Sequence, residues 1–402
     1  MAPPPRRRTL LLTLPFAATL VAIISWALMN QQVFMPPPKI GKSDATATAK
    51  AILRALPTAT NLPAIAADPG AVTPRSSTYV DDVKMPVSMV FAPDGRMFFS
   101  EVVEGTVRIA VPDGDKAKLL PDPFVKVEIA KGGESGTLGV ALDPEFSRNH
   151  WVYLYYSEPD PNRADRRPLR NRIVRFTEVN NIGTDMKVIF DDIDMSRQGR
   201  HNGGRMLFGP DGKLYVTTGN AEEKENSQDL TNPNGKLLRI NPDGSIPDDN
   251  PFPNSPIFAY GFRNMFGLAI HPVSQAFYVT ENSGDSHDEI NLIQAGANYG
   301  FPFFEGYSSG SQYVDPIWES GTRTIGPTGM TFYTGDQLPQ FKNDLFFCAF
   351  NTGTMTRMRL NGTFDGVLGA EDVVKDCFLD VTNGPDGALY YSSVSAILRL
   401  GK

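Results

Sequence analysis

The stretch FGPDGKLYVTTGN, from Phe208 to Asn220, decides the fold because the same phrase recurs along the chain. It opens on a Pro-Asp-Gly turn, in which proline presets φ, aspartate offers an acceptor and glycine tolerates a positive φ. A strand of alternating large residues follows the turn. Related copies begin at Phe91, Leu142, Ile270, Phe341 and Asn383, and they read FAPDGRMFFSE, LDPEFSRNHWVYLYYS, IHPVSQAFYVTEN, FKNDLFFCAF and NGPDGALYYSS.

This repetition predicts an all-β fold, a six-bladed β-propeller over residues 79–402. From Tyr79 onward, apolar and polar residues alternate between Gly, Pro, Asp and Asn turns, and no long stretch has helical periodicity. Several copies are followed by a second strand with a basic residue near its end: GTVRIA, NRIVRF, GKLLRI, TMTRMRL and SAILRL. A pair of β-sandwiches is the alternative, but it would not explain six copies of one phrase.

The composition excludes several classes of protein. The net charge of −7 and the pI near 5.3 are opposite to the basic surface that nucleic-acid binding normally requires, so no nucleic-acid partner is expected. Two cysteines are too few for a disulfide-dense scaffold or a multi-cysteine zinc site. Whether Cys348 and Cys377 pair depends on the compartment, and the sequence leaves that open.

The N-terminus predicts membrane attachment. Three arginines, Arg6 to Arg8, precede a mostly apolar run from Thr9 to about Met29, close to the roughly 20 residues that a helix needs to cross the bilayer. We interpret residues 1–29 as a signal anchor or transmembrane segment, with a cleaved signal peptide as the alternative. The positive-inside rule then places the propeller on the periplasmic or extracellular side, and residues 30–78 read as a flexible linker.

His201 is the first candidate for chemistry. It lies in the glycine-rich turn GRHNGGR directly before the third copy of the repeat, where loops of a propeller meet at one end of its axis. A neutral imidazole can accept a proton from a hydroxyl. Arg263, in YGFRN, holds the same place before the fourth copy and could bind an oxyanion or carboxylate. The alternatives are a turn histidine that satisfies backbone groups and a surface arginine.

A candidate cation site follows the fourth repeat strand. The loop ENSGDSHDE, from Glu281 to Glu289, packs carboxylates and carbonyls closely, and such hard oxygen donors suit Ca²⁺. An ordinary solvated acidic loop is the alternative.

These blocks also resemble a known family. HNGGRMLFGPDGKLYVTTGN, NPNGKLLRINPDGSIPDDNPF, YGFRNMFGLAIHP and DEINLIQAGANYGFP look like the glucose/sorbosone dehydrogenase family, and GGESGTLGVALDPEF matches its second-blade phrase. Members are soluble-type aldose dehydrogenases that use pyrroloquinoline quinone (PQQ) and Ca²⁺. The resemblance extends from about Val80 to Leu400 and implies a six-bladed propeller, in agreement with the repeat count.

The resemblance also implies roles for individual residues. His201 would take the proton from the anomeric hydroxyl of the sugar while hydride passes to the C5 carbon of the quinone. Arg263 would polarise the C5 oxygen, with Asn264 beside the cofactor. Glu134 stands where the family has a glutamine next to the substrate. The calcium ion would lie near Ser283 and Gly284, with Asp288 supporting the loop.

The chain departs from the family where the cofactor's carboxylates are held. The family uses a lysine after the fifth repeat strand and two arginines before the sixth, but here residues 349–354 and 377–381 contain neither residue type. Each lost charge-assisted hydrogen bond is worth about 1.5–3 kcal/mol. Arg200, Arg205 and Arg323 are the candidates for replacing the missing cations.

The sequence therefore favours a quinoprotein that oxidises aldoses to lactones and passes electrons to an external acceptor. Loss of the carboxylate-binding cations supports an alternative, a non-catalytic extracellular binding propeller that no longer holds PQQ. A Ca²⁺-dependent hydrolase or lactonase is a third reading, for which the sequence offers no convincing set of carboxylates.

Overall fold

The computed structural model describes residues 62–402 apart from 67, 69, 163, 167 and 309–311. The predicted signal anchor and most of the predicted linker lie outside these residues. Within the part of the chain that is described, no helix is long and apolar enough to span a bilayer.

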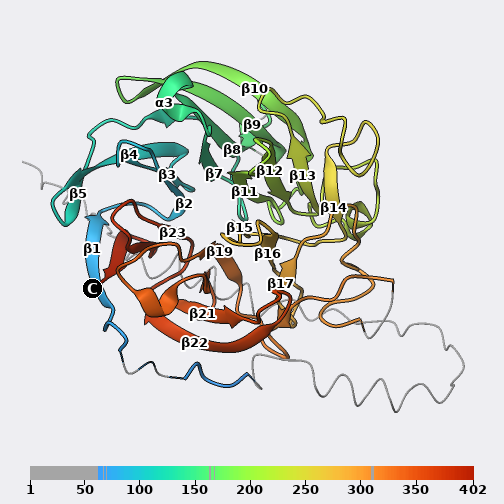
Figure 1. The fold of residues 1–402 in the computed structure, drawn as a ribbon. Coiled ribbons are helices and arrows are strands. Elements are labelled where there is room, and N and C mark those ends of the chain that lie inside the picture. The colour runs from blue at the N-terminus through green and yellow to red at the C-terminus, as the bar shows by residue number, and fades with distance from the viewer. Residues whose placement is uncertain (1–61, 67, 69, 163, 167, 309–311) are drawn as a thin grey trace, which may run out of the picture. The chain divides into compact units, whose positions relative to one another are not determined.

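The predicted propeller is confirmed: six antiparallel sheets surround a common axis (Figure 1). The first blade contains β2 (Pro86–Phe91), β3 (Met97–Glu101), β4 (Thr106–Asp113), β5 (Lys116–Leu119) and β6 (Val125–Lys126). The second contains β7 (Thr137–Leu142), β8 (Trp151–Pro159), β9 (Pro168–Val179) and β10 (Ile182–Asp194). The third contains β11 (Gly203–Phe208), β12 (Leu214–Thr218), β13 (Lys236–Ile240) and β14 (Ile257–Tyr260). The fourth contains β15 (Gly267–Ile270), β16 (Phe277–Glu281), β17 (Glu289–Leu292) and β18 (Trp318–Glu319). The fifth contains β19 (Pro327–Phe332), β20 (Leu345–Ala349), β21 (Thr354–Leu360) and β22 (Val367–Lys375). The short helices are α3 (Phe146–Asn149), η1 (Lys224–Ser227) and η2 (Pro339–Phe341).

The last blade closes the ring with a strand from the other end of the described chain. It contains β23 (Val381–Asn383), β24 (Leu389–Ser392) and β25 (Ala396–Gly401), and β1 (Arg75–Asp81) pairs with β25 as the outermost strand. The propeller thus begins before the boundary at residue 79 that composition predicts. The first residues of β1 are exposed and polar, as expected at a sheet edge, so they lack the apolar alternation of a buried strand.

The repeated phrase corresponds to one structural unit. In each blade it spans the turn between the first and second strands, and Gly212 in the third blade adopts a φ of 72° at that turn. The recurring arginine of the third strand reaches back to the turn: Arg239 Nε donates to Asp211 Oδ2 at 2.9 Å, and Arg399 Nε donates to Asp386 Oδ2 at 2.7 Å. The basic residue of the pattern therefore holds the turn of its own blade.

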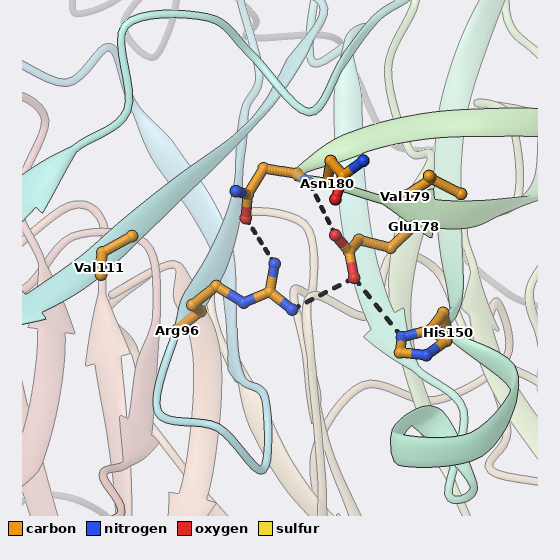
Figure 2. A pocket seen from close by; sticks show the side chains of 7 residues that line it. Arg96, Val111, His150, Glu178, Val179 and Asn180 are labelled. Carbon is orange, nitrogen blue, oxygen red and sulfur yellow. Dashed lines mark hydrogen bonds and ion pairs between the residues drawn. The ribbon is translucent and has the colours of Figure 1, made fainter.

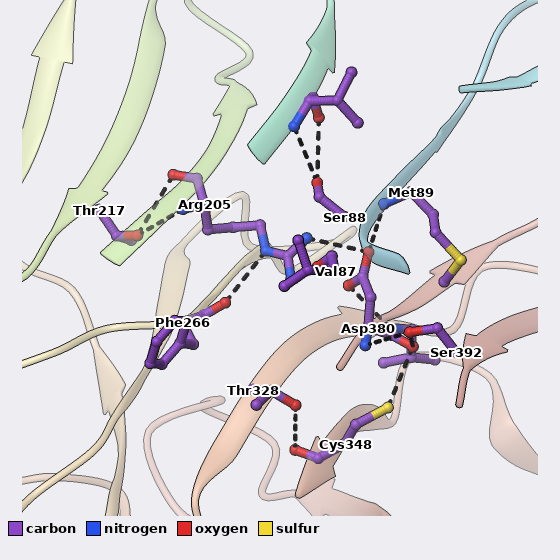
Figure 3. Close-up of polar contacts among 12 residues, drawn as sticks. Val87, Ser88, Met89, Arg205, Thr217, Phe266, Thr328, Cys348, Asp380 and Ser392 are labelled. Atoms are coloured by element: carbon purple, nitrogen blue, oxygen red, sulfur yellow. Dashed lines mark hydrogen bonds and ion pairs between the residues drawn. The ribbon is translucent and has the colours of Figure 1, made fainter. Parts of the chain in front are cut away.

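One arginine ties several blades together across the axis (Figure 3). Arg205, on β11, forms an ion pair with Asp380 at 3.1 Å and donates to the carbonyl oxygens of Val87 at 3.0 Å and Phe266 at 3.2 Å. These partners belong to or adjoin the first strands of the sixth, first and fourth blades. On β19, a Cβ at Gly329 would lie 2.1 Å from Asp380 Oδ1, so only glycine leaves room for the pair. We call Arg205 and Asp380 the axial ion pair.

Candidate active site

The predicted site residues come together at one end of the propeller. Glu134 precedes β7, His201 precedes β11 and Arg263 precedes β15. The first strands of neighbouring blades contact one another around the ring. The loops that lead into them therefore lie side by side.

Direct hydrogen bonds join three of the predicted residues. The backbone N–H of His201 donates to Glu134 Oε2 at 2.9 Å, and Asn264 Nδ2 donates to the same oxygen at 3.1 Å. Asn264 Oδ1 in turn accepts from the N–H of Gly203 at 3.1 Å. Glu134 is thus the hub between the second, third and fourth blades, and burial raises the pKa of its carboxyl group.

The imidazole of His201 is held in the form that can act as a base. Asn220 Oδ1 accepts the backbone N–H of Glu222 at 3.0 Å, which fixes the orientation of the amide. The same oxygen lies 2.8 Å from His201 Nδ1, so Nδ1 must carry the proton and Nε2 keeps its lone pair. Burial, assisted by the positive charge of Arg263, lowers the pKa of His201 to about 3. The side chain is therefore neutral at physiological pH.

Arg263 is fixed by the end of the fourth repeat strand. The backbone N–H groups of Arg263 and Asn264 both donate to Glu281 Oε1, at 3.0 and 2.8 Å. The guanidinium Nη1 donates to the carbonyl oxygen of Asn282 at 3.0 Å. Glu281 is buried, and this burial raises the pKa of its carboxyl group well above the usual range. Arg263 is thus a positioned cation and not a mobile surface side chain.

The predicted calcium loop lies directly beside Arg263. Asp288 accepts the N–H of Ser283 at 3.1 Å with one oxygen, and the N–H groups of Ile325 and Gly326 at 2.6 and 2.9 Å with the other. It therefore supports the loop through backbone hydrogen bonds. The N–H of Gly284 donates to Glu305 Oε1 at 3.2 Å.

Two of the three candidate replacement cations are paired with carboxylates, and the third shares a groove with two acidic residues. Arg205 belongs to the axial ion pair, and Arg200 lies 3.6 Å from the carboxylate of Glu222. Arg323 lines a groove of about 270 Å³ that Glu371 and Asp372 of β22 also line. The structure thus gives Arg205 a structural role in place of the proposed cofactor contact, because the buried Asp380 requires a counter-charge.

Sequence reasoning missed Asn220 and Glu305 as site residues, and it placed Glu281 in the candidate cation loop without its role as the acceptor that holds Arg263. Asn220 follows β12 and Glu281 ends β16, so both stand where a second repeat strand reaches the His201 end. The polar residue near the end of the repeated phrase is the signal that the sequence offers: Asn220 ends FGPDGKLYVTTGN, and Glu281 is next to last in IHPVSQAFYVTEN. Glu305 comes from the long connection between β17 and β18, and no repeat pattern marks it.

A separate cavity lies between the first and second blades (Figure 2). It measures about 630 Å³ and is lined by Arg96, His150 and Glu178 among others. Arg96 forms an ion pair with Glu178 at 3.2 Å and donates to Asn181 Oδ1 at 2.5 Å, so its charge is already matched. His150 follows α3 at the turn between the first and second strands of its blade.

Replacing Asn220 with aspartate is expected to make any reaction that uses His201 as its base sensitive to acid. A carboxylate beside Nδ1 should raise the pKa of His201 by about 1–3 units, because an opposite charge favours the imidazolium. The wild-type rate should stay level as the pH falls from about 8 to about 5, whereas the variant should lose activity as imidazolium forms. A rate–pH profile measures this, with Asn180→Asp as control. Parallel profiles for both variants would contradict it.

Comparison with known proteins gives concordant results. The family model for glucose / sorbosone dehydrogenase matches residues 83–397. The aldose sugar dehydrogenase YliI of Escherichia coli K12 is 30% identical over 335 residues, which cover 77% of this chain and 87% of that protein. A Hedgehog-interacting protein of Mus musculus is 28% identical, with 53% of this chain and 35% of that protein covered.

Solved structures similar to this chain point to the same kind of protein. A putative oxidoreductase (glucose dehydrogenase) of Thermus thermophilus is 32% identical and superimposes with a TM-score of 0.72, covering 81% of this chain and 99% of that one. The PQQ-bound aldose sugar dehydrogenase of Streptomyces coelicolor is 26% identical, with a TM-score of 0.70 over 83% of this chain and 99% of that one.

Proposed function

The chain belongs to the glucose/sorbosone dehydrogenase family, and on that premise we propose that it is an oxidoreductase that converts the anomeric hydroxyl of an aldose to the lactone. The observation that carries the proposal is the neutral, buried imidazole of His201, whose Nε2 is left to accept a proton. A general base of this kind suits the removal of a hydroxyl proton.

Each site residue then has a defined task. His201 Nε2 takes the proton from the anomeric hydroxyl while the hydrogen on the same carbon leaves as hydride to a two-electron acceptor. Arg263 stabilises the negative charge that develops on the acceptor's oxygen. Glu134 Oε1 lies 3.4 Å from Asn264 Nδ2, a long contact, and its carboxylate beside His201 is placed to accept a hydrogen bond from a sugar hydroxyl.

Calcium suits the donors of the 282–288 loop. The backbone carbonyl oxygens of Ser283 and Gly284 and the neighbouring carboxylate of Glu305 are the hard oxygen ligands that Ca²⁺ prefers. No set of three or more His, Cys, Asp or Glu side chains within the described residues is arranged to hold a metal. Backbone oxygens would therefore have to supply much of the coordination, and the bound ion would add positive charge beside Arg263.

PQQ is the cofactor that the relatives' names suggest, but the described residues do not fit its three carboxylates. The loops that hold them in the family contain Phe350 and Phe378 here, together with the disulfide between Cys348 and Cys377. Arg263 already lies near the carboxylates of Glu134 and Glu305, and Arg323 shares its groove with Glu371 and Asp372. We therefore derive no step through PQQ.

A non-catalytic sugar-binding propeller is the second candidate. The missing cations favour it, and the match to a Hedgehog-interacting protein joins the chain to a relative whose name describes an interaction. Such a protein would keep Glu134 and His201 as hydrogen-bonding groups for the sugar. It would transfer no hydride.

An assay of the full chain separates the two candidates. Purified protein with Ca²⁺ is given a panel of aldoses and, in separate reactions, PQQ or an uncharged quinone, and reduction of a terminal dye is followed. The proposed dehydrogenase reduces the dye only when sugar is present. Sugar binding by calorimetry without reduction supports the binding protein, and neither binding nor reduction contradicts both.

We propose in addition that the N-terminal segment anchors the chain in a membrane with the propeller outside the cytoplasm. The basic residues before the apolar run support this orientation. Fractionation and protease accessibility of whole cells test it; a propeller found in the cytosolic fraction would contradict it.

A further inference from the structure

The loops at the His201 end divide into two chemically different halves. The second, third and fourth blades supply Glu134, His201 and Arg263. The fifth and sixth blades supply Phe350, after β20, and Phe378, before β23, whose ring centroids lie 6.2 Å apart at 76°. We call these two residues the phenylalanine pair. They pack, with Met85 of the loop before β2, against buried apolar residues that include Val87, Val102 and Leu379.

The two halves belong to one continuous ring of loops. Arg263 Nη1 donates to the carbonyl of Asn282, and Asn282 Nδ2 donates to the carbonyl of Pro327 at 2.8 Å. The N–H of Phe350 donates to the carbonyl of Gly326, the residue before Pro327, at 2.8 Å. Three hydrogen bonds therefore lead from the guanidinium of Arg263 to the backbone of Phe350. A planar ligand that extends from Arg263 along these hydrogen bonds would approach the loop that carries Phe350.

The described charges around the phenylalanine pair disfavour an anionic ligand. Arg200 and Arg205 are paired with Glu222 and Asp380. Arg263, beside which the proposed Ca²⁺ ion would lie, is already near Glu134 and Glu305, and Arg323 shares its groove with Glu371 and Asp372. A carboxylate placed against the phenylalanine pair would lose its hydration without gaining a counter-ion there. An uncharged aromatic ring would lose little hydration there. Its edge or face contacts with the two phenylalanine rings would add about 0.5–1.5 kcal/mol to the stabilisation from buried apolar area.

We propose that the redox partner bound between Arg263 and the phenylalanine pair is an uncharged quinone and not a carboxylate-bearing one. The proposal rests on the proposed dehydrogenase function and names its hydride acceptor. The sugar loses a hydride from its anomeric carbon and a proton from its anomeric hydroxyl and becomes the lactone. The quinone gains that hydride and a proton and becomes the hydroquinone, with Arg263 bonded to one of its oxygens.

The test compares ligands that differ in charge, without sugar. The full chain is titrated in the presence of Ca²⁺ with PQQ, with PQQ trimethyl ester and with 2-methyl-1,4-naphthoquinone, and binding is followed by calorimetry. We expect the ester and the naphthoquinone to bind at least about tenfold more tightly than PQQ, because PQQ must give up the hydration of carboxylates that gain no counter-ion there. PQQ binding as tight as that of its ester, or no binding of any of the three, would overturn the proposal.

Variants test the assigned location. Phe350→Lys places a cation in the apolar half and should reverse the preference toward PQQ, whereas Phe350→Leu keeps the half apolar and should leave the preference unchanged. Asn351→Lys, at an exposed neighbouring position, serves where Phe350→Lys does not fold. An unchanged preference in whichever lysine variant folds would overturn the location.

These titrations are independent of turnover. Ligand preference is measured without a sugar, so a failed preference leaves the sugar-dependent assay to decide the proposed function. A chain that prefers uncharged quinones but oxidises no sugar would contradict the proposed function alone.

Discussion

Substitution of His201 by asparagine is expected to lower sugar-dependent quinone reduction by about 10²–10⁴-fold, the usual contribution of a positioned general base. Asparagine is preferred to alanine because His201 has a φ of 55°, a left-handed conformation that asparagine tolerates better than most residues. The amide cannot take a proton from the anomeric hydroxyl. Turnover should fall while sugar affinity, measured by calorimetry, changes little.

His150→Asn provides a matched control for this substitution. His150 also has a φ of 55°, but it lies in the turn after α3, at the opposite end of its blade from the loops that carry the site. The same chemical change there should leave turnover within about twofold of the wild type, as is usual for surface substitutions. Equal losses in the two variants would show that the His201 effect is not base removal.

The sequence predicts the fold well because a repeated turn has local chemistry. Three of the six copies carry a Pro-Asp-Gly turn and the other three keep a turn followed by the same aromatic strand, so the copies identify the six blades without knowledge of any contact between them. Strand β1 is harder to predict from the sequence. It is defined by its pairing with β25, some 320 residues away, and its own exposed residues carry no strand pattern. Long-range pairing leaves no mark in a local pattern.

The site was predictable where position in the repeat determines position in space. His201 and Arg263 both precede first strands, and the structure brings their loops together through Glu134 and Asn264. Partners of charged residues were not predictable in this way. Arg205 is as basic as Arg263 in the sequence, yet a buried aspartate from another blade engages it. Only the folded arrangement shows which arginine lies beside His201 and Glu134 in the candidate site.

Replacing Arg205 with methionine is expected to destabilise the propeller by about 3–5 kcal/mol, because it leaves the carboxylate of Asp380 buried without its counter-charge. The side chains of Arg205 and Asp380 are only 10% and 4% exposed. The carbonyl oxygens of Val87 and Phe266 lose a donor as well. Denaturant unfolding should show a lower midpoint with an unchanged slope if the folded state otherwise persists. Lys84→Met, which breaks the exposed pair with Asp82, should leave the unfolding midpoint nearly unchanged.

A second substitution identifies the cause of this loss. If the uncompensated charge dominates, Asp380→Asn should restore part of the stability lost in the Arg205→Met background, although it destabilises the wild type. The pH dependence of the stability lost in Arg205→Met should also show that the charge of Asp380 is the cause. Burial already raises the pKa of Asp380 with Arg205 present, and removing the cation should raise it further. Because the folded-state pKa then lies above the unfolded value, the deficit is fully present above the folded pKa and shrinks as the pH falls through it. A deficit that is independent of pH, and that Asp380→Asn does not relieve, would mean that packing around Arg205 and not charge holds the blades together.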